Sequence, residues 1–301
     1  MVRGWPVRHT RRVSVSVEIV EPVVAWFDGA ARDLPWRRPE CSPWGVLVSE
    51  FMLQQTPVSR VLEPWRRWLE RWPVPAALAA EPAGEAIRAW GRLGYPRRAM
   101  RLHAAAVAIT ERHDGQVPPD HQQLLDLPGV GTYTAAAIAS FAFGQRHVVL
   151  DTNVRRVLGR VLDGSALPGP APTRGEYARA QALLPEEPER AARWAAASME
   201  LGALVCTARK PDCSQCPVID VCAWRKSGSP DNAAPRRGQR YDGTDRQCRG
   251  AILRVLRESE EPVSAAQIDL AWPEPVQRER ALQSLIADGL VVATSLEYRL
   301  P

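Results

Sequence analysis

Lysine, long apolar runs and strand patterns are all scarce in this sequence. Only two of the 39 basic residues are lysines, Lys210 and Lys226, and the other 37 are arginines. The longest apolar run is the Ala-rich stretch at 135–143, which is far shorter than the roughly 18 residues that a membrane span needs. No signal-like segment opens the chain. The sequence therefore excludes a membrane-spanning protein, and we expect a soluble, unsecreted one.

What is present indicates a globular protein with unevenly distributed charge. The chain of 301 residues is 45% apolar, so most of it should form the packed core of one large or two ordinary domains. Residues 206–257 carry 11 basic and 5 acidic side chains, whereas residues 258–301 carry 3 and 8. A local excess of arginine suits phosphate binding, because a guanidinium group can donate two hydrogen bonds to one phosphate. Codon usage that favours arginine explains the shortage of lysine equally well.

Four of the six cysteines lie within 17 residues, as Cys206, Cys213, Cys216 and Cys222. Such a group can bind a metal ion or a cluster, or can form two disulfides. Disulfides are disfavoured in a chain without a secretory signal. Zinc ribbons usually carry two C-x2-C pairs and this sequence has one, so we expect an iron–sulfur cluster and keep zinc as the alternative.

The patterns predict a disordered start at 1–17, an all-α domain at 18–225, a linker at 226–244 and a small module at 245–301. Residues 1–17 lack a helical period, and the linker is polar and rich in Gly, Pro and Arg. Within the all-α domain, Ser42 and Pro43 form an N-cap followed by proline at the first helical position. Helical patterns cover 20–32, 46–55, 59–72, 83–93, 96–113, 121–127, 132–143, 153–162, 174–184 and 188–205.

The C-terminal module shows the element order of a winged helix. Three helical patterns at 246–258, 264–271 and 276–288 precede strand patterns at 290–293 and 297–300 that can pair as a hairpin. The net charge of −5 from residue 258 onward argues against a main role in reading DNA, because a groove reader is normally basic. A structural cap or a protein-contact module is an equally good interpretation.

The segment Leu127-Pro128-Gly129-Val130-Gly131 lies between two helical patterns, with Thr132 available as the N-cap of the second. Glycines here let the backbone turn with positive φ and direct successive N–H groups at one point, which forms an anion site. The pattern is typical of a helix-hairpin-helix, which binds DNA phosphates without reading sequence. For the motif taken alone, an ordinary interhelical turn is the alternative.

Two acidic residues have positions that suit paired acid–base chemistry. Glu50 follows Val46 and Leu47 on a mainly apolar helix face, where burial favours the protonated form that a general acid requires. Asp151 follows the apolar Val148–Leu150 at the start of a helix, where an aspartate is most often only an N-cap. A protonated and an ionised carboxyl flanking a bond are the arrangement that breaks glycosidic linkages. A buried structural glutamate is the alternative for Glu50.

These motifs together resemble the adenine DNA glycosylases of the MutY type, within the helix-hairpin-helix superfamily that also contains endonuclease III. The resemblance covers residues 20–225 and rests on five motifs in order. They are Val48-Ser49-Glu50-Phe51-Met52-Leu53-Gln54-Gln55-Thr56, Leu93-Gly94-Tyr95, Leu127–Gly131, Leu150-Asp151-Thr152-Asn153-Val154 and the cysteine loop at 206–222. The resemblance implies a two-lobed, all-α helix-hairpin-helix glycosylase fold with a 4Fe–4S cluster. It also implies removal of adenine mispaired with 8-oxoguanine or guanine in double-stranded DNA, by a monomer in the bacterial cytoplasm at the nucleoid.

The resemblance also implies roles for individual residues. Glu50 protonates an adenine that has been flipped out of the duplex, and Asp151 stabilises or traps the sugar cation. Asn153 holds that carboxylate, and Tyr133 hydrogen-bonds near the catalytic pair. The hairpin residues implied to bind DNA phosphates are Gly129, Gly131 and Thr132. Those implied to contact the oxidised guanine are Gln55, Thr56, Leu93, Gly94 and Tyr95. Those implied to line the adenine pocket are Trp36, Leu53, Val58 and Glu200. Those implied to hold the cluster are Cys206, Cys213, Cys216 and Cys222.

The scarcity of lysine now bears on mechanism. Relatives such as endonuclease III use a lysine beside the hairpin to form a Schiff base and cut the strand, but no lysine precedes Lys210 here. We therefore expect a monofunctional glycosylase. Glu50 further separates the chain from endonuclease III, and the pair Gln54-Gln55 separates it from thymine mismatch glycosylases. A glycosylase for another mispaired base, such as thymine, and a non-catalytic DNA-binding cluster protein remain the alternatives.

Two features depart from the family pattern. Many members carry a Nudix-like domain that inspects 8-oxoguanine, and residues 244–301 are too short and too helical for such a domain. Members often have a second tyrosine after Leu-Gly-Tyr, whereas Pro96 follows Tyr95 here. We therefore expect the contacts around the oxidised guanine to differ from those of the family.

Overall fold

The computed structural model describes the backbone of residues 8–230, 241–295 and 297–301, and within these ranges the side chains from Val17 onward. The chain divides into two units. The first contains the chain up to Glu40, Pro119–Gln122 and the chain from Gly131 to the linker. The second contains Cys41–Pro118, Gln123–Val130 and the C-terminal module. None of the described helices is both long and apolar enough to cross a membrane.

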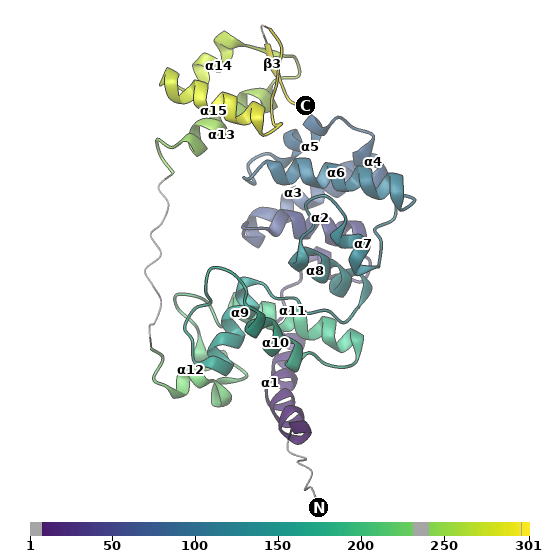
Figure 1. The fold of residues 1–301 in the computed structure, drawn as a ribbon, viewed down its shortest axis with the longest axis vertical. Coiled ribbons are helices and arrows are strands. Elements are labelled where there is room, and N and C mark those ends of the chain that lie inside the picture. Colours follow the sequence, from purple (N-terminus) through teal and green to yellow (C-terminus); the bar gives the residue numbers. More distant parts are fainter. Residues whose placement is uncertain (1–7, 231–240, 296) are drawn as a thin grey trace, which may run out of the picture. The chain divides into compact units, whose positions relative to one another are not determined.

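The first unit consists of helices followed by the cysteine loop (Figure 1). Its helices are α1 (Arg8–Ala30), α8 (Thr132–Phe143), α9 (Thr152–Leu158), α10 (Arg174–Leu183), α11 (Pro188–Leu204) and α12 (Ala223–Lys226). Short 3-10 turns lie at Pro35–Arg37, Cys213–Gln215 and Ile219–Val221, and a π-helical turn at Gly159–Asp163 extends α9. The short α7 (His121–Leu125) contains residues of both units.

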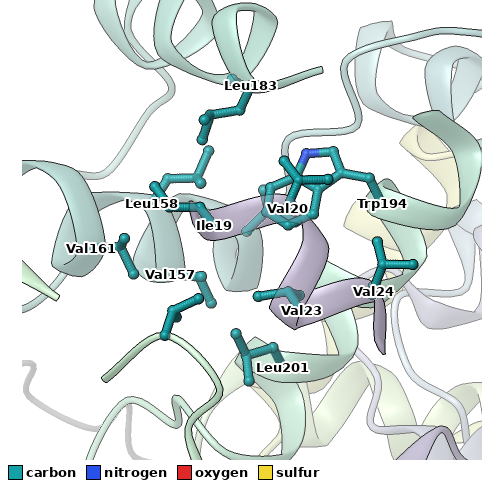
Figure 2. Packing of buried hydrophobic residues seen from close by; sticks show 14 of the residues in the cluster. Ile19, Val20, Val23, Val24, Val157, Leu158, Val161, Leu183, Trp194 and Leu201 are labelled. Atoms are coloured by element: carbon teal, nitrogen blue, oxygen red, sulfur yellow. The ribbon is translucent and has the colours of Figure 1, made fainter. Parts of the chain in front are cut away.

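Helix α1 supplies one side of the core of the first unit. Its residues Val20, Val23, Val24 and Phe27 follow the spacing of a single helix face, and all four are buried. In Figure 2 this face meets side chains of α9 and α11, among them Leu201. The packing therefore holds together the helices that carry most of the functional residues of this unit.

The described part of α1 begins earlier than the sequence predicted. Residues 8–17 are helical, where disorder was expected, and residues 1–7 lie outside the described part of the chain. Once the packed half of a helix is nucleated, each further residue adds a backbone hydrogen bond at little cost, so no apolar period is needed. Of the predicted linker, residues 231–240 likewise lie outside the described residues.

The second unit is built around α2 (Pro43–Leu53). Every residue of α2 from Trp44 to Met52 is buried, as expected for a helix that is covered on all sides. Ser42 caps it by accepting a hydrogen bond from Gly45 N, with proline at the first position, as the sequence predicted. The other helices of this unit before the module are α3 (Val58–Arg71), α4 (Pro75–Ala79), α5 (Ala83–Trp90) and α6 (Arg97–Arg112).

The C-terminal module has the predicted order of elements and one additional strand. Its elements are α13 (Asp245–Glu258), β1 (Val263–Ser264), α14 (Ala265–Ala271), α15 (Pro275–Ala287), β2 (Val292–Ala293) and β3 (Glu297–Arg299). The predicted hairpin of β2 and β3 is antiparallel, with Val292 opposite Arg299, and the additional β1 pairs with the other edge of β3. Two residues are too few to show an alternating pattern, so β1 could not be predicted from the sequence.

Candidate functional site

Asp151 caps the N-terminus of α9. Its Oδ1 accepts a 2.6 Å hydrogen bond from Val154 N, and its Oδ2 accepts one of 2.8 Å from Asn153 Nδ2. The interpretation of Asp151 as an N-cap is thus confirmed, and the cap orients the carboxylate. Burial raises the pKa of Asp151 above its ordinary value, while the two hydrogen bonds and the positive charge of Arg156 act in the opposite direction.

Arg156 connects the Asp151 cap to the start of the cysteine loop. Its Nη2 donates to Asn153 Oδ1 at 2.7 Å and to Gly202 O at 2.6 Å, and its Nε donates to Cys206 O at 2.7 Å. Gly202 lets α11 approach α9 closely, because a Cβ there would lie 2.7 Å from Asn153 Cβ. Sequence reasoning missed both Arg156 and Gly202, since Gly202 and Cys206, which Arg156 contacts, are 46 or more residues away from it along the chain.

The four clustered cysteines line one pocket, together with apolar side chains such as Val205, Val218 and Trp224. Arg160 braces this loop, donating through Nη1 to Cys206 Sγ at 3.3 Å and to Thr207 O at 2.8 Å. In the described part of the chain, no three His, Cys, Asp or Glu side chains form a ready-made site for a single metal ion. The thiols are arranged instead around a shared pocket.

The chemistry of this loop fits an iron–sulfur cluster. Burial, with a smaller contribution from the neighbouring thiols Cys206, Cys222 and Cys213, raises the pKa of Cys216 to about 11. Four thiolates can therefore ionise together here only when a positively charged group binds them. Arg160 donates a hydrogen bond to Cys206 Sγ, and the sulfurs of iron–sulfur clusters commonly accept hydrogen bonds of this kind.

The hairpin glycines have different local roles. Gly129 has φ of 81°, and a Cβ there would lie 2.7 Å from Arg101 Cβ and 3.0 Å from Phe51 Cε1, so this position requires glycine. The N-cap of α8 is Gly131 and not Thr132, which is instead the first helical residue and makes no side-chain cap. Gly131 provides no side-chain cap, and nothing lies within 4 Å of its Cβ position, so there is room for an anion at this helix N-terminus.

Glu50 lies in the middle of α2, in the second unit, and is only 5% exposed. Tyr133, Asp151 and Asn153 lie in the first unit, Tyr133 in the first turn of α8. Leu53 and Val58, at the end of α2 and the start of α3, are half-buried. Each unit thus contributes part of the residue set that the sequence singled out.

A buried guanidinium holds together the two loops expected to contact the base opposite the adenine. Arg98 donates to Phe51 O and Met52 O at 3.0 Å, to Gln54 O, to Thr56 Oγ1 at 2.9 Å and to Gly94 O at 3.1 Å. Burial lowers the pKa of Arg98 to about 10, which leaves it charged at neutral pH. No local pattern marks this role, because four of the five acceptors, at the end of α2 and in the loop after it, meet Arg98 only after folding.

The same loops hold two residues in left-handed backbone conformations. Gln55 has φ of 56° and Tyr95 has φ of 48°, which are uncommon values for residues with a side chain. Tyr95 is 52% exposed, an unusual fraction for an aromatic residue next to a core. Pro96, the departure from the family pattern, precedes α6 with φ of −62°, the value that its ring imposes.

Glu200 is fully buried in α11 between two arginines. Arg32 donates to it through its backbone N at 3.0 Å and through Nε and Nη2 at 2.7 Å, and Arg37 donates through Nη2 at 2.9 Å. Burial opposes ionisation of Glu200, but these contacts outweigh it and lower its pKa to about 2. Trp36, which precedes Arg37, is also buried. The sequence predicted Glu200 and Trp36 as pocket residues but missed both arginines.

Comparison with known proteins agrees with this arrangement. Residues 48–178 match the model of the HhH-GPD superfamily of base excision DNA repair proteins, and residues 206–222 match the iron–sulfur binding domain of endonuclease III. The chain is 53% identical over 274 residues to the adenine DNA glycosylase of Mycobacterium tuberculosis, covering 90% of each chain. It is 54% identical over 282 residues to that of Mycolicibacterium smegmatis, covering 93% of this chain and 94% of the relative.

A solved structure described as a thermostable thymine-DNA glycosylase has the same fold. It matches with a TM-score of 0.64 at 25% identity and covers 72% of this chain and 98% of its own. The expected helix-hairpin-helix glycosylase fold is therefore confirmed, as is the expectation of an iron–sulfur cluster in place of zinc.

Proposed function

Because this chain belongs to the adenine DNA glycosylases, within the HhH-GPD superfamily of base excision DNA repair proteins, we propose that it removes adenine mispaired with 8-oxoguanine or guanine. The substrate is double-stranded DNA, and the protein acts as a monomer in the cytoplasm, at the nucleoid. The observation that carries this proposal is the Asp151 carboxylate, whose two oxygens are each held by a short hydrogen bond at the start of α9.

The proposed reaction is a heterolytic cleavage of the bond between adenine and its sugar. The bonding electron pair leaves with adenine, whose ring accepts a proton from Glu50, and the sugar C1′ becomes an oxocarbenium ion. Asp151 in its ionised form stabilises or traps this cation, and water then adds to C1′ and loses its proton to a carboxylate. Asn153 orients Asp151, and Tyr133 hydrogen-bonds near the pair.

The environments of the two carboxyl groups support this division of roles. Glu50 is enclosed in a helix whose neighbouring positions are all buried, and such a site favours a carboxyl group that carries its proton. Burial raises the pKa of Asp151, but its two hydrogen bonds and the charge of Arg156 act toward the ionised form. Two carboxyls in such different settings are typical of an acid paired with an anion.

Other residues bind the DNA and the two bases. The N–H groups at Gly129, Gly131 and Thr132 bind a phosphate, and adenine flips into a pocket lined by Trp36, Leu53, Val58 and Glu200. The loops fastened by Arg98 place Gln55, Thr56, Leu93, Gly94 and Tyr95 against the base left opposite. Cys206, Cys213, Cys216 and Cys222 hold the 4Fe–4S cluster. The cluster, when bound, supplies a rigid loop that carries Arg209 and Lys210 to the DNA backbone.

A single-turnover assay tests the proposal. The protein is incubated with duplexes that contain A·8-oxoguanine, A·G, T·G or uracil, and alkali then converts abasic sites into strand breaks. We expect abasic product from the two adenine duplexes, with no breaks before alkali because no lysine precedes Lys210. Cleavage of T·G without cleavage of A·8-oxoguanine would favour the thymine alternative instead, and absence of any abasic product would favour a non-catalytic binder.

A further inference from the structure

A groove rich in arginine lies in the second unit between the base-contacting loops and the first helix of the C-terminal module. Its volume is about 1200 Å³, which exceeds the roughly 300–1,000 Å³ of a small-molecule pocket. Eight of its lining residues are arginines and two are acidic. Gln55, Gly94 and Tyr95 line the same groove. The size and charge therefore suit a polyanion better than a small ligand.

Helix α13 presents a continuous cationic face to this groove. Arg246, Gly250, Arg254 and Arg257 follow one another at helical spacings of four, four and three residues, and all four line the groove. Arg246 and Arg254 are exposed. Gly250 lies in the middle of this face, where the Tyr241 hydroxyl is 3.5 Å from its Cβ position, so an aromatic side chain lies among the arginines.

Among the described residues, several arginines of the groove lack an internal counterion, although Arg88 pairs with Glu85. In the part of the chain that the structure describes, Arg92, Arg246 and Arg254 form no ion pair with an acidic residue. Of the two acidic lining residues, Asp288 is already shared by Arg97 and Arg249. Burial and the nearby charges of Arg92 and Arg254 lower the pKa of Arg257, while the other acidic residue, Glu258, raises it, and the net shift is downward. Positive charges that crowd one another in this way favour an anion from outside the protein.

The module is fastened so that α13 keeps this position beside α5. Arg88 Nη1 donates to Ser259 O at 2.8 Å and also to Arg257 O. Gly84 N donates to Pro301 O at 2.5 Å, and a Cβ on Gly84 would clash with that oxygen at the same distance. The groove is therefore a built feature of the second unit.

We propose that this groove binds the phosphate backbone of the DNA strand opposite the excised adenine, next to the base that Gln55 and Tyr95 contact. The inference rests on the proposed function. The net charge of −5 for residues 258–301 does not oppose it, because all four arginines of α13 precede residue 258. The module thereby clamps the strand without reading its sequence, since arginine contacts to phosphate carry no sequence information.

Salt-dependent binding of the full chain to an A·8-oxoguanine duplex that carries a non-cleavable adenine analogue tests this inference. The variant Arg246→Ala/Arg254→Ala should lower the slope of log affinity against log salt by about two and weaken binding roughly tenfold near physiological salt. Arg246→Lys/Arg254→Lys should restore most of the slope. The matched control, Arg66→Ala/Arg67→Ala, removes two exposed arginines of α3 that pair with Glu63, and should leave the slope unchanged.

Uncharged methylphosphonate linkages then identify the strand. Placed opposite the adenine, they should weaken binding of the wild-type chain but not of the Arg246→Ala/Arg254→Ala variant, whereas linkages beside the adenine should weaken both equally. An unchanged slope, or a loss confined to linkages in the adenine strand, would overturn the inference. Adenine excision by the wild-type chain is read separately. If the wild-type chain does not excise adenine, the proposed function is wrong. If it does, but the salt slope of the Arg246→Ala/Arg254→Ala variant is unchanged, only the inference about the groove is wrong.

Discussion

Asn153 Nδ2 donates a 2.8 Å hydrogen bond to Asp151 Oδ2, and the opposite end of the same amide accepts a 2.7 Å hydrogen bond from Arg156. The asparagine is therefore fixed at both ends, and its amide cannot flip without losing both contacts. Because Arg156 also binds Cys206 O, the position of the carboxylate depends on the start of the cysteine loop as well as on its own helix.

Asn153→Leu should slow adenine excision about tenfold to a hundredfold, because a hydrogen bond to a charged group contributes about 1.5–3 kcal/mol. That bond lowers the pKa of Asp151, which burial raises, so its loss should raise the pKa further. Excision requires ionised Asp151, and the acid limb of the single-turnover pH profile should therefore move to higher pH. Thr152→Val, at the exposed neighbouring position, is the control. An acid limb that stays in place would contradict this role of Asn153.

Glu50→Gln should abolish excision and leave duplex binding intact, because glutamine fills the same space but cannot deliver a proton. The measurement is single-turnover excision beside a binding titration with the same A·8-oxoguanine duplex. Glu63→Gln, at an exposed position of α3, is the control and should retain full activity. Retained excision by Glu50→Gln would overturn the assignment of the general acid.

Glu200→Ala should destabilise the first unit by about 3 kcal/mol, because it leaves the Arg32 and Arg37 guanidinium groups without their shared carboxylate. The pKa of Glu200 is lowered from 4.5 to about 2, so the pairing contributes fully above pH 4.5 and is lost as the pH falls through about 2. Denaturant unfolding at pH 7 and pH 3 measures both effects. Asp33→Asn, which breaks an exposed pair with Arg38, should change stability little. Equal effects of the two variants would contradict the prediction.

Gly202→Ala should cost about 1–3 kcal/mol of stability and also slow excision, because the new methyl group meets Asn153 Cβ at 2.7 Å and pushes α9 away from α11. Thermal unfolding and single-turnover excision measure the two effects. Gly29→Ala is the matched control, because nothing lies within 4 Å of its Cβ position in α1. A normal rate in Gly202→Ala would show that the Asn153 contact does not depend on this close approach.

Cys213→Ser should lower the iron content and weaken duplex binding more than it slows excision of bound substrate, because the loop loses the rigidity that presents Arg209 and Lys210. Iron analysis, visible absorbance and a salt titration of duplex binding provide the measurements. Cys41→Ser, at a cysteine outside the loop, should keep its iron. A Cys213→Ser variant with full iron content and full affinity would contradict the proposed ligand set.

Local patterns were sufficient for much of the fold. The spacing of the four cysteines, the cap at Ser42 followed by Pro43 and the limits of α8 all depend on neighbours a few residues away, and the structure agrees with each. The same locality limited the prediction of details. Thr132 looks like an N-cap by residue type, yet the backbone places Gly131 in that position.

The sequence by itself determined the family, the cysteine loop and the absence of a lysine nucleophile, since each is a matter of which residues occur and at what spacing. Only the tertiary structure decided which arginines hold distant parts of the chain together. Four of the five acceptors of Arg98 lie more than 40 residues earlier, at the end of α2 and in the loop after it, and Arg32 meets Glu200 at a separation of 168 residues. A guanidinium group on a long side chain has no local pattern to mark its partner, so folding alone separates the buried Arg98 and the half-buried Arg32 from the exposed Arg246 and Arg254.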